Sequence, residues 1–474
     1  MKSIIKKILS LICFWALLFG GLTFMYRVFS WKDTSGDYFS CVNQAYSLKD
    51  HIVDVAFFGP SVTYSSYNPA VFWEQSGLAT FNYGVSGQDR SASTYYVKEV
   101  LQKQSPKVIV LSTTYVYTNT YAVQGNLYRN ALSLTPSLNS FQMIRKVVPN
   151  NSLSTPQSLK DYYLRWPIVH SRYKELKEGD FVAVKENEYC LGFSYGFDSW
   201  NQEVFSSNST DQSDFIPIDP QVREWVDSLK SLGDEKGFTL LFVTTPTDFS
   251  QGERYIINGF QQYLEEKGIP YLDLNQKLDD MDFNVATDMT DAIHANSYGA
   301  TKISSYLGSY LKEHYDLKDH RGDGGYEVYE QCLSVYKHHL FEHSVLPTLD
   351  SIGLTAALAE NTSFLYSVTV HPQGEITQKI MDLLGKAGVS NEQILQGGTW
   401  ILRGTQILCS PAYKPYGIQV NQNDFLHVTP ELSEKRLDTV SVGTTDYVTP
   451  YQTNCCIVTY DLVLDRVIDV HEFY

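Results

Sequence analysis

The stretch Val53-Asp-Val-Ala-Phe-Phe-Gly-Pro-Ser-Val-Thr-Tyr64 decides the fold of this 474-residue chain. Residues 53–58 predict a buried strand, and the Gly59-Pro60 pair after them predicts a tight turn that presents Ser61. Outward from this stretch, strand-like runs at 108–111, 238–244 and 270–274 alternate with helix-like runs at 95–104, 220–235, 260–267 and 298–314. This alternation indicates an α/β fold, with a central parallel sheet and helices on both faces.

A second segment, Asp291-Ala-Ile-His294, places an acid and a histidine three residues apart before the last of these helices. A serine hydroxyl is a poor nucleophile until a base removes its proton, and the base needs a third group to orient it. Ser61, His294 and Asp291 supply these three parts. Two alternatives stay open: Asp291 caps the following helix, or Asp288 is the acid.

Polar and small residues follow several of the predicted strands. Parallel sheets bind ligands beyond the carboxyl ends of their strands. Ser61, Gly87 and Thr114 each lie just after a predicted strand, so we expect them to share one edge.

Three blocks occur in a fixed order: Gly59-x-Ser61, Asn82-Tyr-Gly-Val-Ser-Gly-Gln88 and Asp291-x-x-His294. Together they resemble the SGNH (GDSL-like) hydrolase superfamily, in particular its membrane-anchored, extracytoplasmic branch of polysaccharide O-acetyltransferases and esterases. The resemblance covers about residues 50–315. It implies a three-layer, flavodoxin-like fold in which Ser61 is the nucleophile and the Asp-x-x-His pair completes the triad.

The same resemblance implies that Gly87 and an asparagine of a third block donate hydrogen bonds to the oxyanion. The sequence after the strand 108–111 is Ser112-Thr-Thr-Tyr115, which contains no asparagine. Thr114 occupies the approximate place, and its hydroxyl could donate one hydrogen bond. Loss of one oxyanion donor typically costs roughly 10²–10³ in rate, so this departure bears on activity rather than on the fold.

The N-terminus begins Met1-Lys-Ser-Ile-Ile-Lys-Lys7 and continues with the apolar run 8–26. Nineteen helical residues span roughly 28 Å, close to the thickness of a bilayer core. The lysines before the run favour a cytoplasmic amino end. We therefore expect residues 1–30 to be an uncleaved signal anchor of a single-pass cell-membrane protein whose bulk is extracytoplasmic. The alternative is a cleaved signal peptide.

The rest of the chain predicts an insertion and a second domain. Residues 118–215 fit the alternation poorly and read as an insertion within a 31–320 hydrolase-like domain, either a substrate cover or an ordinary helical subdomain. A glycine-rich break at 319–325 marks a domain boundary. Residues 325–474 then predict a helical linker and a β-rich α+β domain, whose closing hairpin at 454–473 resembles an ILEI (interleukin-like EMT inducer) domain.

The composition of the chain limits the kinds of binding partner that we expect. The net charge of −16 disfavours nucleic acid. The 34 tyrosines are compatible with a sugar-binding groove, although such rings are also normal core residues.

The segment His339-Leu-Phe-Glu-His343 matches a zinc-protease pattern, but no third ligand is evident and we expect a solvated helix face. One disulfide in the C-terminal third is an expectation whose pairing stays open.

These features predict a cell-surface serine esterase or O-acyl(acetyl)transferase that acts on a surface or cell-wall polysaccharide through an acyl-Ser61 intermediate. No cofactor or metal is implied. The expected partners are acylated glycan, the membrane and surface-polymer biosynthesis proteins. The alternative is a catalytically degenerate glycan-binding or assembly protein on the same fold.

Overall fold

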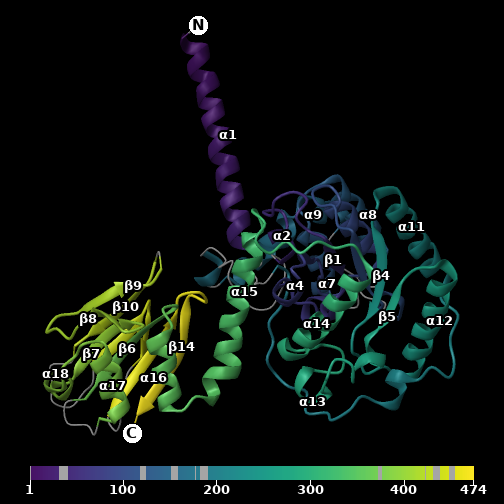
Figure 1. Ribbon diagram of the computed structural model, residues 1–474. Coiled ribbons are helices and arrows are strands. Elements are labelled where there is room, and N and C mark those ends of the chain that lie inside the picture. Colours follow the sequence, from purple (N-terminus) through teal and green to yellow (C-terminus); the bar gives the residue numbers. More distant parts are fainter. Residues whose placement is uncertain are drawn as a thin grey trace. The chain divides into compact units, whose positions relative to one another are not determined.

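The computed structural model divides into two compact units, Met1–Leu333 and Ser334–Tyr474 (Figure 1). The division falls within helix α15 (Glu327–Leu340), somewhat later than the glycine-rich break at 319–325. The residues that the structure describes are 2–30, 41–117, 124–150, 158–176, 178–181, 191–371, 376–421, 423–430, 438–447 and 454–473.

The first unit is built on a five-stranded parallel sheet with the strand order β2-β1-β3-β4-β5. Its strands are β1 (Val55–Phe58), β2 (Thr80–Asn82), β3 (Val108–Ser112), β4 (Thr239–Thr244) and β5 (Tyr271–Asp273). This order confirms the predicted α/β class, and it is the flavodoxin-like order. The winding direction reverses between β1 and β3, where sheets of this kind form a ligand crevice.

Helices cover both faces of the sheet. Val55 and Phe57 face a core that includes Phe72 of α4 (Pro69–Ser76) and Ile303 of α14 (Ser297–His314). On the opposite face, Phe242 of β4 contacts Trp225 of α11 (Pro220–Lys236) and Phe260 of α12 (Gln251–Lys267). The strands are apolar on both faces for this reason, and the unit has three layers.

Two predicted helices have different bounds in the structure. Helix α5 (Arg90–Val100) begins five residues before the predicted 95–104, because the Asp89 carboxylate caps the Ala92 N–H at 2.7 Å. Helix α12 begins at Gln251 rather than near 260. Its start carries a capping box, in which Ser250 and Glu253 satisfy each other's backbone N–H groups. That Ser-x-x-Glu signal was present in the sequence.

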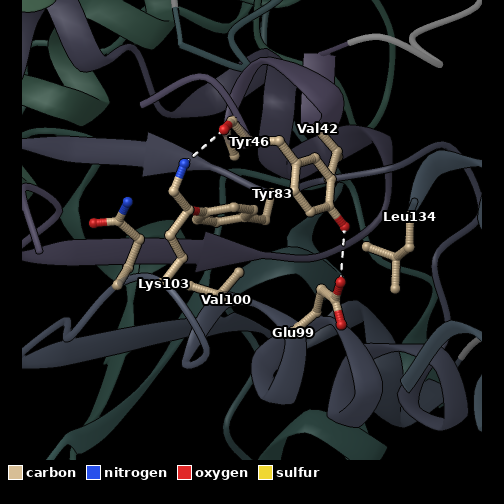
Figure 2. Close-up of a pocket in the computed structure, with 9 residues that line it drawn as sticks. Val42, Tyr46, Tyr83, Glu99, Val100, Lys103 and Leu134 are labelled. Carbon is tan, nitrogen blue, oxygen red and sulfur yellow. Dashed lines mark hydrogen bonds between the residues drawn. The ribbon is translucent and has the colours of Figure 1, made fainter. Parts of the chain in front are cut away.

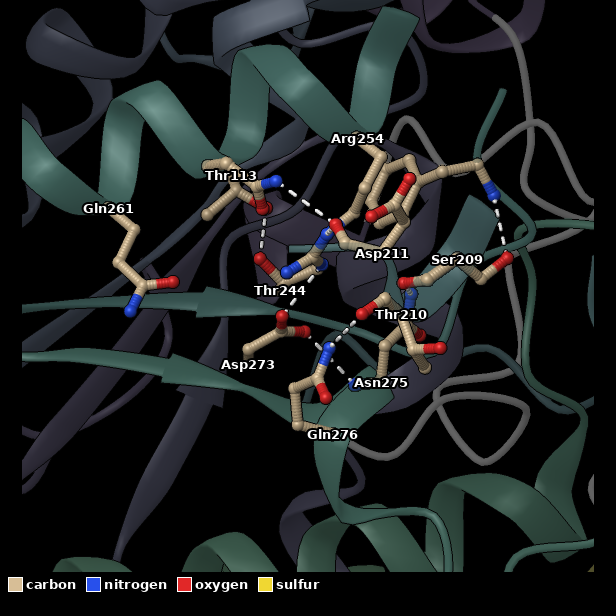
Figure 3. Close-up of polar contacts among 12 residues, drawn as sticks. Thr113, Ser209, Thr210, Asp211, Thr244, Arg254, Gln261, Asp273, Asn275 and Gln276 are labelled. Carbon is tan, nitrogen blue, oxygen red and sulfur yellow. Dashed lines mark hydrogen bonds and ion pairs between the residues drawn. The ribbon is translucent and has the colours of Figure 1, made fainter. Parts of the chain in front are cut away.

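A buried ion pair joins α12 to the carboxyl end of β5 (Figure 3). Arg254 Nη1 lies 2.7 Å from Asp273 Oδ2, and their side chains are 0% and 7% exposed. Burial raises the pKa of Asp273, and the Arg254 charge opposes that rise. Arg254 Nε also donates to the Asp211 carbonyl at 3.1 Å. The pair therefore fastens the end of the predicted insertion to the sheet, since breaking such a pair typically costs about 3–5 kcal/mol.

The described part of the predicted insertion is mostly helical before residue 180 and mostly without regular secondary structure after residue 190. Its α-helices are α7 (Gln124–Ser133), α8 (Leu138–Asn150), α9 (Leu159–Leu164) and α10 (Trp166–His170). Arg172 follows α10 and donates to the carbonyls of Phe29 and Ser30, each at 2.8 Å. Those two residues end and follow helix α1 (Lys2–Phe29), so this region holds the base of the N-terminal helix.

Helix α1 is apolar over Lys6–Phe29, a stretch of 24 residues with a hydropathy of 2.2. The helix is exposed over most of this stretch and becomes buried near its end, at Val28. By length and composition it can cross a membrane.

The second unit contains two antiparallel sheets, which agrees with the expected β-rich domain. A five-stranded sheet has the order β14-β13-β6-β7-β8, and a four-stranded sheet has the order β12-β11-β10-β9. The larger sheet contains β6 (Phe364–Val370), β7 (Gly398–Arg403), β8 (Gln406–Cys409), β13 (Cys455–Asp461) and β14 (Arg466–Phe473). The smaller sheet contains β9 (Tyr416–Gln419), β10 (Phe425–Thr429), β11 (Thr439–Val442) and β12 (Thr445–Tyr447).

Alternation along β13 explains how the larger sheet is covered. Cys455 and Ile457 face a core with helices α16 (Ser351–Glu360), α17 (Gln378–Lys386) and α18 (Asn391–Gln396). Cys456 and Val458 point to the other face, where they join Leu426 and Val428 of the smaller sheet. The predicted hairpin at 454–473 is confirmed as β13 paired with β14.

The cysteines of the last third do not pair with one another. Cys332 is disulfide-bonded, whereas Cys409, Cys455 and Cys456 are not in disulfides.

Candidate active site

Ser61 lies at the turn between β1 and the short helix α3 (Ser61–Ser66). A glycine is required at position 59, because a Cβ there would collide with Thr63 Oγ1 and approach Ser112 Cβ to 2.8 Å. Pro60 stands at the N-cap of α3 and provides no side-chain cap. The tight turn therefore leaves the Ser61 hydroxyl and its N–H group at the carboxyl edge of the sheet.

The loop between α13 (Val285–Asp288) and α14 carries the acid and the histidine. An isolated antiparallel bridge between Met289 and Ala295 closes the loop, and Thr290 N–H donates to the His294 carbonyl at 2.8 Å. Within it, Asp291 Oδ1 accepts the N–H groups of Ile293 and His294, both at 2.9 Å. These bonds hold the carboxylate beside the imidazole.

The three predicted residues form one hydrogen-bonded chain. His294 Nε2 lies 2.6 Å from Ser61 Oγ, and His294 Nδ1 lies 2.8 Å from Asp291 Oδ2. Partial burial raises the pKa of Asp291, but hydrogen bonds from the Ile293 and His294 backbones and from the His294 ring outweigh it, so the net pKa is below the ordinary value. The side chain of His294 is 27% exposed, so solvent reaches the site.

Asp291 and Asp288 have different contacts, and these contacts distinguish their roles. Asn296, not Asp291, is the N-cap of α14, since its side chain accepts from the Tyr298 and Gly299 N–H groups at 3.0 Å. Asp288 Oδ2 accepts from Lys302 Nζ at 2.8 Å and from a backbone N–H at 2.7 Å. Asp288 is thus held by α14, and the carboxylate that contacts His294 is that of Asp291.

Gly87 and Thr114, the two expected oxyanion donors, differ in their surroundings. The Gly87 N–H has no acceptor among the described residues, and the loop before Gly87 is tied to the nucleophile turn by Val85 N–H, which donates to the Gly59 carbonyl at 3.1 Å. Thr114 is buried, and its Oγ1 accepts from Ser112 Oγ at 2.9 Å and also hydrogen-bonds the Tyr117 side chain. The Thr114 hydroxyl therefore already has partners.

An asparagine that the sequence motifs did not indicate lies beside Gly87. Asn126 comes from α7, and its side chain covers the face of Gly87 where a Cβ would stand, with Nδ2 2.5 Å from that position. Its carbonyl oxygen Oδ1 accepts from Ser86 Oγ at 3.3 Å and from Arg129 Nη1 at 3.2 Å. No local motif marks Asn126, because the contact spans about forty residues.

The extended segment 191–200 runs along the same edge of the sheet. Ser194 N–H donates to the Tyr64 carbonyl at 2.9 Å, and the backbone of Gly196 accepts from Ser297 N–H at 2.6 Å. Trp200 N–H donates to the Met289 carbonyl at 2.8 Å. The segment thus contacts both the nucleophile helix and the histidine loop.

A small cavity lies against the C-terminal end of α5, and the triad residues are not among those that line it (Figure 2). It has a volume of about 30 Å³ and is walled mainly by apolar atoms. Tyr46 lines it and donates to Glu99 Oε1 at 3.1 Å, and Lys103 Nζ donates to the Tyr46 carbonyl at 2.6 Å. A cavity of this size holds about one or two waters and no substrate.

The zinc-protease pattern forms a compact cluster in the second unit. Ligand atoms of His339, Glu342 and His343 lie within 4.8 Å of one another, but Arg466 Nη2 already contacts Glu342 Oε2 at 2.5 Å. Burial and the Arg466 charge lower the pKa of His339 to about 3. Because a guanidinium occupies the carboxylate, the cluster is a poor cation site.

No protein-family model matches the chain, and no curated protein matches it. Among solved structures, it is similar to a protein assigned to the lipolytic G-D-S-L family from Desulfitobacterium hafniense DCB-2, at 12% identity and a TM-score of 0.27, covering 54% of this chain and 98% of the other.

Two further solved structures are similar at the same level. An acylhydrolase-type structure from Bacteroides fragilis NCTC 9343 shares 12% identity at a TM-score of 0.27, covering 57% of this chain and 94% of the other. An acetyl xylan esterase from Butyrivibrio proteoclasticus shares 10% identity at a TM-score of 0.23, and the match covers 56% of this chain and 65% of the esterase. At these scores the likenesses carry no argument, and the chemistry rests on the geometry above.

Proposed function

We propose that the protein is a serine esterase or O-acyltransferase that works through an acyl-Ser61 intermediate. The observation that carries this proposal is the continuous hydrogen-bonded chain from Ser61 Oγ through His294 to Asp291. It stands at the carboxyl edge of a parallel sheet, beside β1, where the strand order reverses.

The residues divide the work of acyl transfer. His294 Nε2 takes the Ser61 proton as the oxygen attacks the ester carbon, and it returns that proton to the departing alcohol. Asp291 accepts a hydrogen bond from Nδ1 and so holds the ring in the tautomer that leaves Nε2 free to accept. Asp291 is ionised at neutral pH, as any carboxyl with a pKa at or below the ordinary value is, and its charge stabilises the transient imidazolium. Water, or a sugar hydroxyl, then receives the acyl group.

A glycan is the proposed acyl carrier or acceptor. An open groove of about 460 Å³ lies along α14 between Thr301 and Glu313, and the three triad residues are not among those that line it. Tyr306 and Tyr310 line it together with the hydroxyls of Thr301 and Ser305. Aromatic faces beside hydroxyl groups suit the mixed apolar and polar surface of a sugar. The N-terminal helix would hold this groove at the outer face of a membrane, where surface polysaccharide is found.

The test is hydrolysis of a chromogenic acetate by the full chain in detergent micelles. We expect Ser61→Ala to lower kcat by at least about 10³-fold. Ser65→Ala is the matched control, because Ser65 lies on the same helix and its hydroxyl donates to the Val62 carbonyl of that helix, at 3.3 Å. Equal rates in wild type and Ser61→Ala would exclude the acyl-Ser61 mechanism and favour a glycan-binding or assembly role. Addition of acceptor oligosaccharide separates hydrolase from transferase.

A further inference from the structure

The loop after β3 offers fewer oxyanion donors than the SGNH resemblance implies. That loop contains no asparagine, and the Thr114 hydroxyl hydrogen-bonds Ser112 and Tyr117. Within the described residues, the backbone N–H groups of Ser61 and Gly87 have no acceptor. A side-chain amide near Gly87 would complete the set, and the described residues place one there, from a helix of the predicted insertion.

The first observation is close packing. Gly87 has a φ of +63°, and an ideal Cβ on it would lie 2.5 Å from Asn126 Nδ2, 2.6 Å from Cγ and 2.7 Å from Cβ. The Asn126 amide therefore lies against the backbone of Gly87, and glycine is needed there both for its backbone conformation and for this approach.

The second observation is orientation. Ser86 Oγ and Arg129 Nη1 both donate to Asn126 Oδ1, at 3.3 and 3.2 Å, which identifies that atom as the carbonyl oxygen. The amide nitrogen is then the other atom, and it has no acceptor among the described residues. The Asn130 side chain fastens α7 to the loop that contains Gly87. Its Nδ2 donates to the backbone carbonyl of Asn126 at 2.8 Å and to the backbone carbonyl of Ser86 at 3.0 Å.

We propose that Asn126 is a catalytic residue whose Nδ2–H donates to the oxyanion together with the Gly87 N–H. This inference deepens the proposed function and rests on it. When Ser61 Oγ bonds to the ester carbon, the carbonyl π pair moves onto oxygen and the Ser61 proton moves to His294. The charged oxygen then accepts from Asn126. On collapse the C=O bond re-forms, and the alcohol leaves with the proton from His294.

With Asn126 as an oxyanion donor, the predicted insertion at 118–215 takes part in catalysis. The donor is held by α7, so the docking of the insertion on the loop that contains Gly87 sets the geometry of the oxyanion site. In this chain, the first helix after β3 and α6, α7, performs the task that the SGNH resemblance assigns to the loop directly after β3.

The test compares Asn126→Asp and Asn126→Ala with wild type and Ser61→Ala, as full chains in micelles with a chromogenic acetate. Asn126→Asp keeps the shape and the acceptor for Ser86 and Arg129 but removes the donor. We expect kcat to fall about 10²–10³-fold in both variants, with KM changed less than about threefold. Asn201→Asp is the matched charge control, since Asn201 is exposed, and it should retain the wild-type rate.

Gly87→Ala gives a second measurement that does not alter Asn126 itself. The added methyl must displace the Asn126 amide, so kcat should fall, and the loss in the Gly87→Ala/Asn126→Ala double variant should be much less than the product of the single losses. Thermal unfolding of each variant separates a lost donor from a lost fold.

The outcomes are distinct. Wild-type activity that needs Ser61 but survives Asn126→Ala overturns this inference and leaves the proposed function standing. A fall in Asn126→Asp alone overturns it too, because charge repulsion would then explain the effect. Wild-type activity that does not depend on Ser61 overturns both proposals.

Discussion

The two ends of strand β1 carry similar side chains with different consequences. At its carboxyl end, Ser61 meets His294, which contacts Asp291 three residues earlier in the chain. Before its amino end, Asp54 Oδ2 lies 3.0 Å from His320 Nε2, and His320 Nδ1 hydrogen-bonds Asp323, three residues later, at 2.9 Å.

The difference lies in the partner of the second ring nitrogen and in access. His294 bridges a carboxylate and a hydroxyl, so it can accept a proton from a nucleophile. His320 bridges two carboxylates and stacks on Tyr326 at 4.3 Å. Its side chain is 11% exposed, against 27% for His294. An imidazole–carboxylate pair therefore provides candidate chemistry only where a hydroxyl and solvent access complete it; otherwise it fastens the fold.

The largest effect that would sharpen this comparison is expected for His294→Gln. Without the base, Ser61 loses its proton acceptor, and kcat for acetate hydrolysis should fall by about 10⁴-fold or more. The free energy of unfolding should change by less than about 1 kcal/mol, because the ring is partly exposed. Steady-state kinetics beside urea unfolding measure both. A loss of activity that merely follows a loss of folded protein would contradict the assignment.

His320→Gln should give the opposite result. The shorter amide cannot bridge Asp54 and Asp323 as the ring does, and the stacking on Tyr326 is lost. We expect the free energy of unfolding to fall by about 1–3 kcal/mol, while kcat stays within about twofold of wild type. A large fall in kcat with unchanged stability would break the comparison, because it would give the amino edge a part in catalysis.

The smallest effect concerns the pH dependence of stability through Asp291. Its folded-state pKa is below the ordinary value of about 3.9. The ionised carboxylate thus adds stability that is present above the unfolded pKa and is lost as the pH falls through the folded pKa. Its side chain is 49% exposed, so solvent screens the effect to less than about 1 kcal/mol.

The measurement is urea unfolding of wild type and Asp291→Asn across the acidic range. The stability difference should be largest at neutral pH and should disappear under strongly acidic conditions. A difference that grows on acidification would contradict the direction of the Asp291 pKa.

Much of the first unit could be predicted because its signals are local. The apolar run 53–58, the glycine turn after it and the regular alternation of runs were sufficient for the parallel sheet and its edge. The hairpin at 454–473 was predictable for the same reason, since two neighbouring strand-like runs flank a short turn. The first half of α12 was missed although Ser250 and Glu253 mark its start, because its apolar periodicity begins only later.

The candidate site divides in the same way. Ser61 and the Asp291/His294 pair have motifs of their own, and the chain order suggested that they meet. The oxyanion assignment to Thr114 relied on position after a strand, and position could not show that Ser112 and Tyr117 bind that hydroxyl. Asn126 has no motif, and its contact with Gly87 exists only once α7 packs on the loop.

The sequence by itself determined the parallel sheet, the apolar N-terminal helix and the three residues of the hydrogen-bonded chain, because periodicity, turn residues and spacing are properties of neighbouring residues. Only the tertiary structure brought the His294 ring to the Ser61 hydroxyl and the Asn126 amide to Gly87. Those contacts depend on distances between segments separated by about forty to more than two hundred residues, and such distances are set by how helices pack on the sheet.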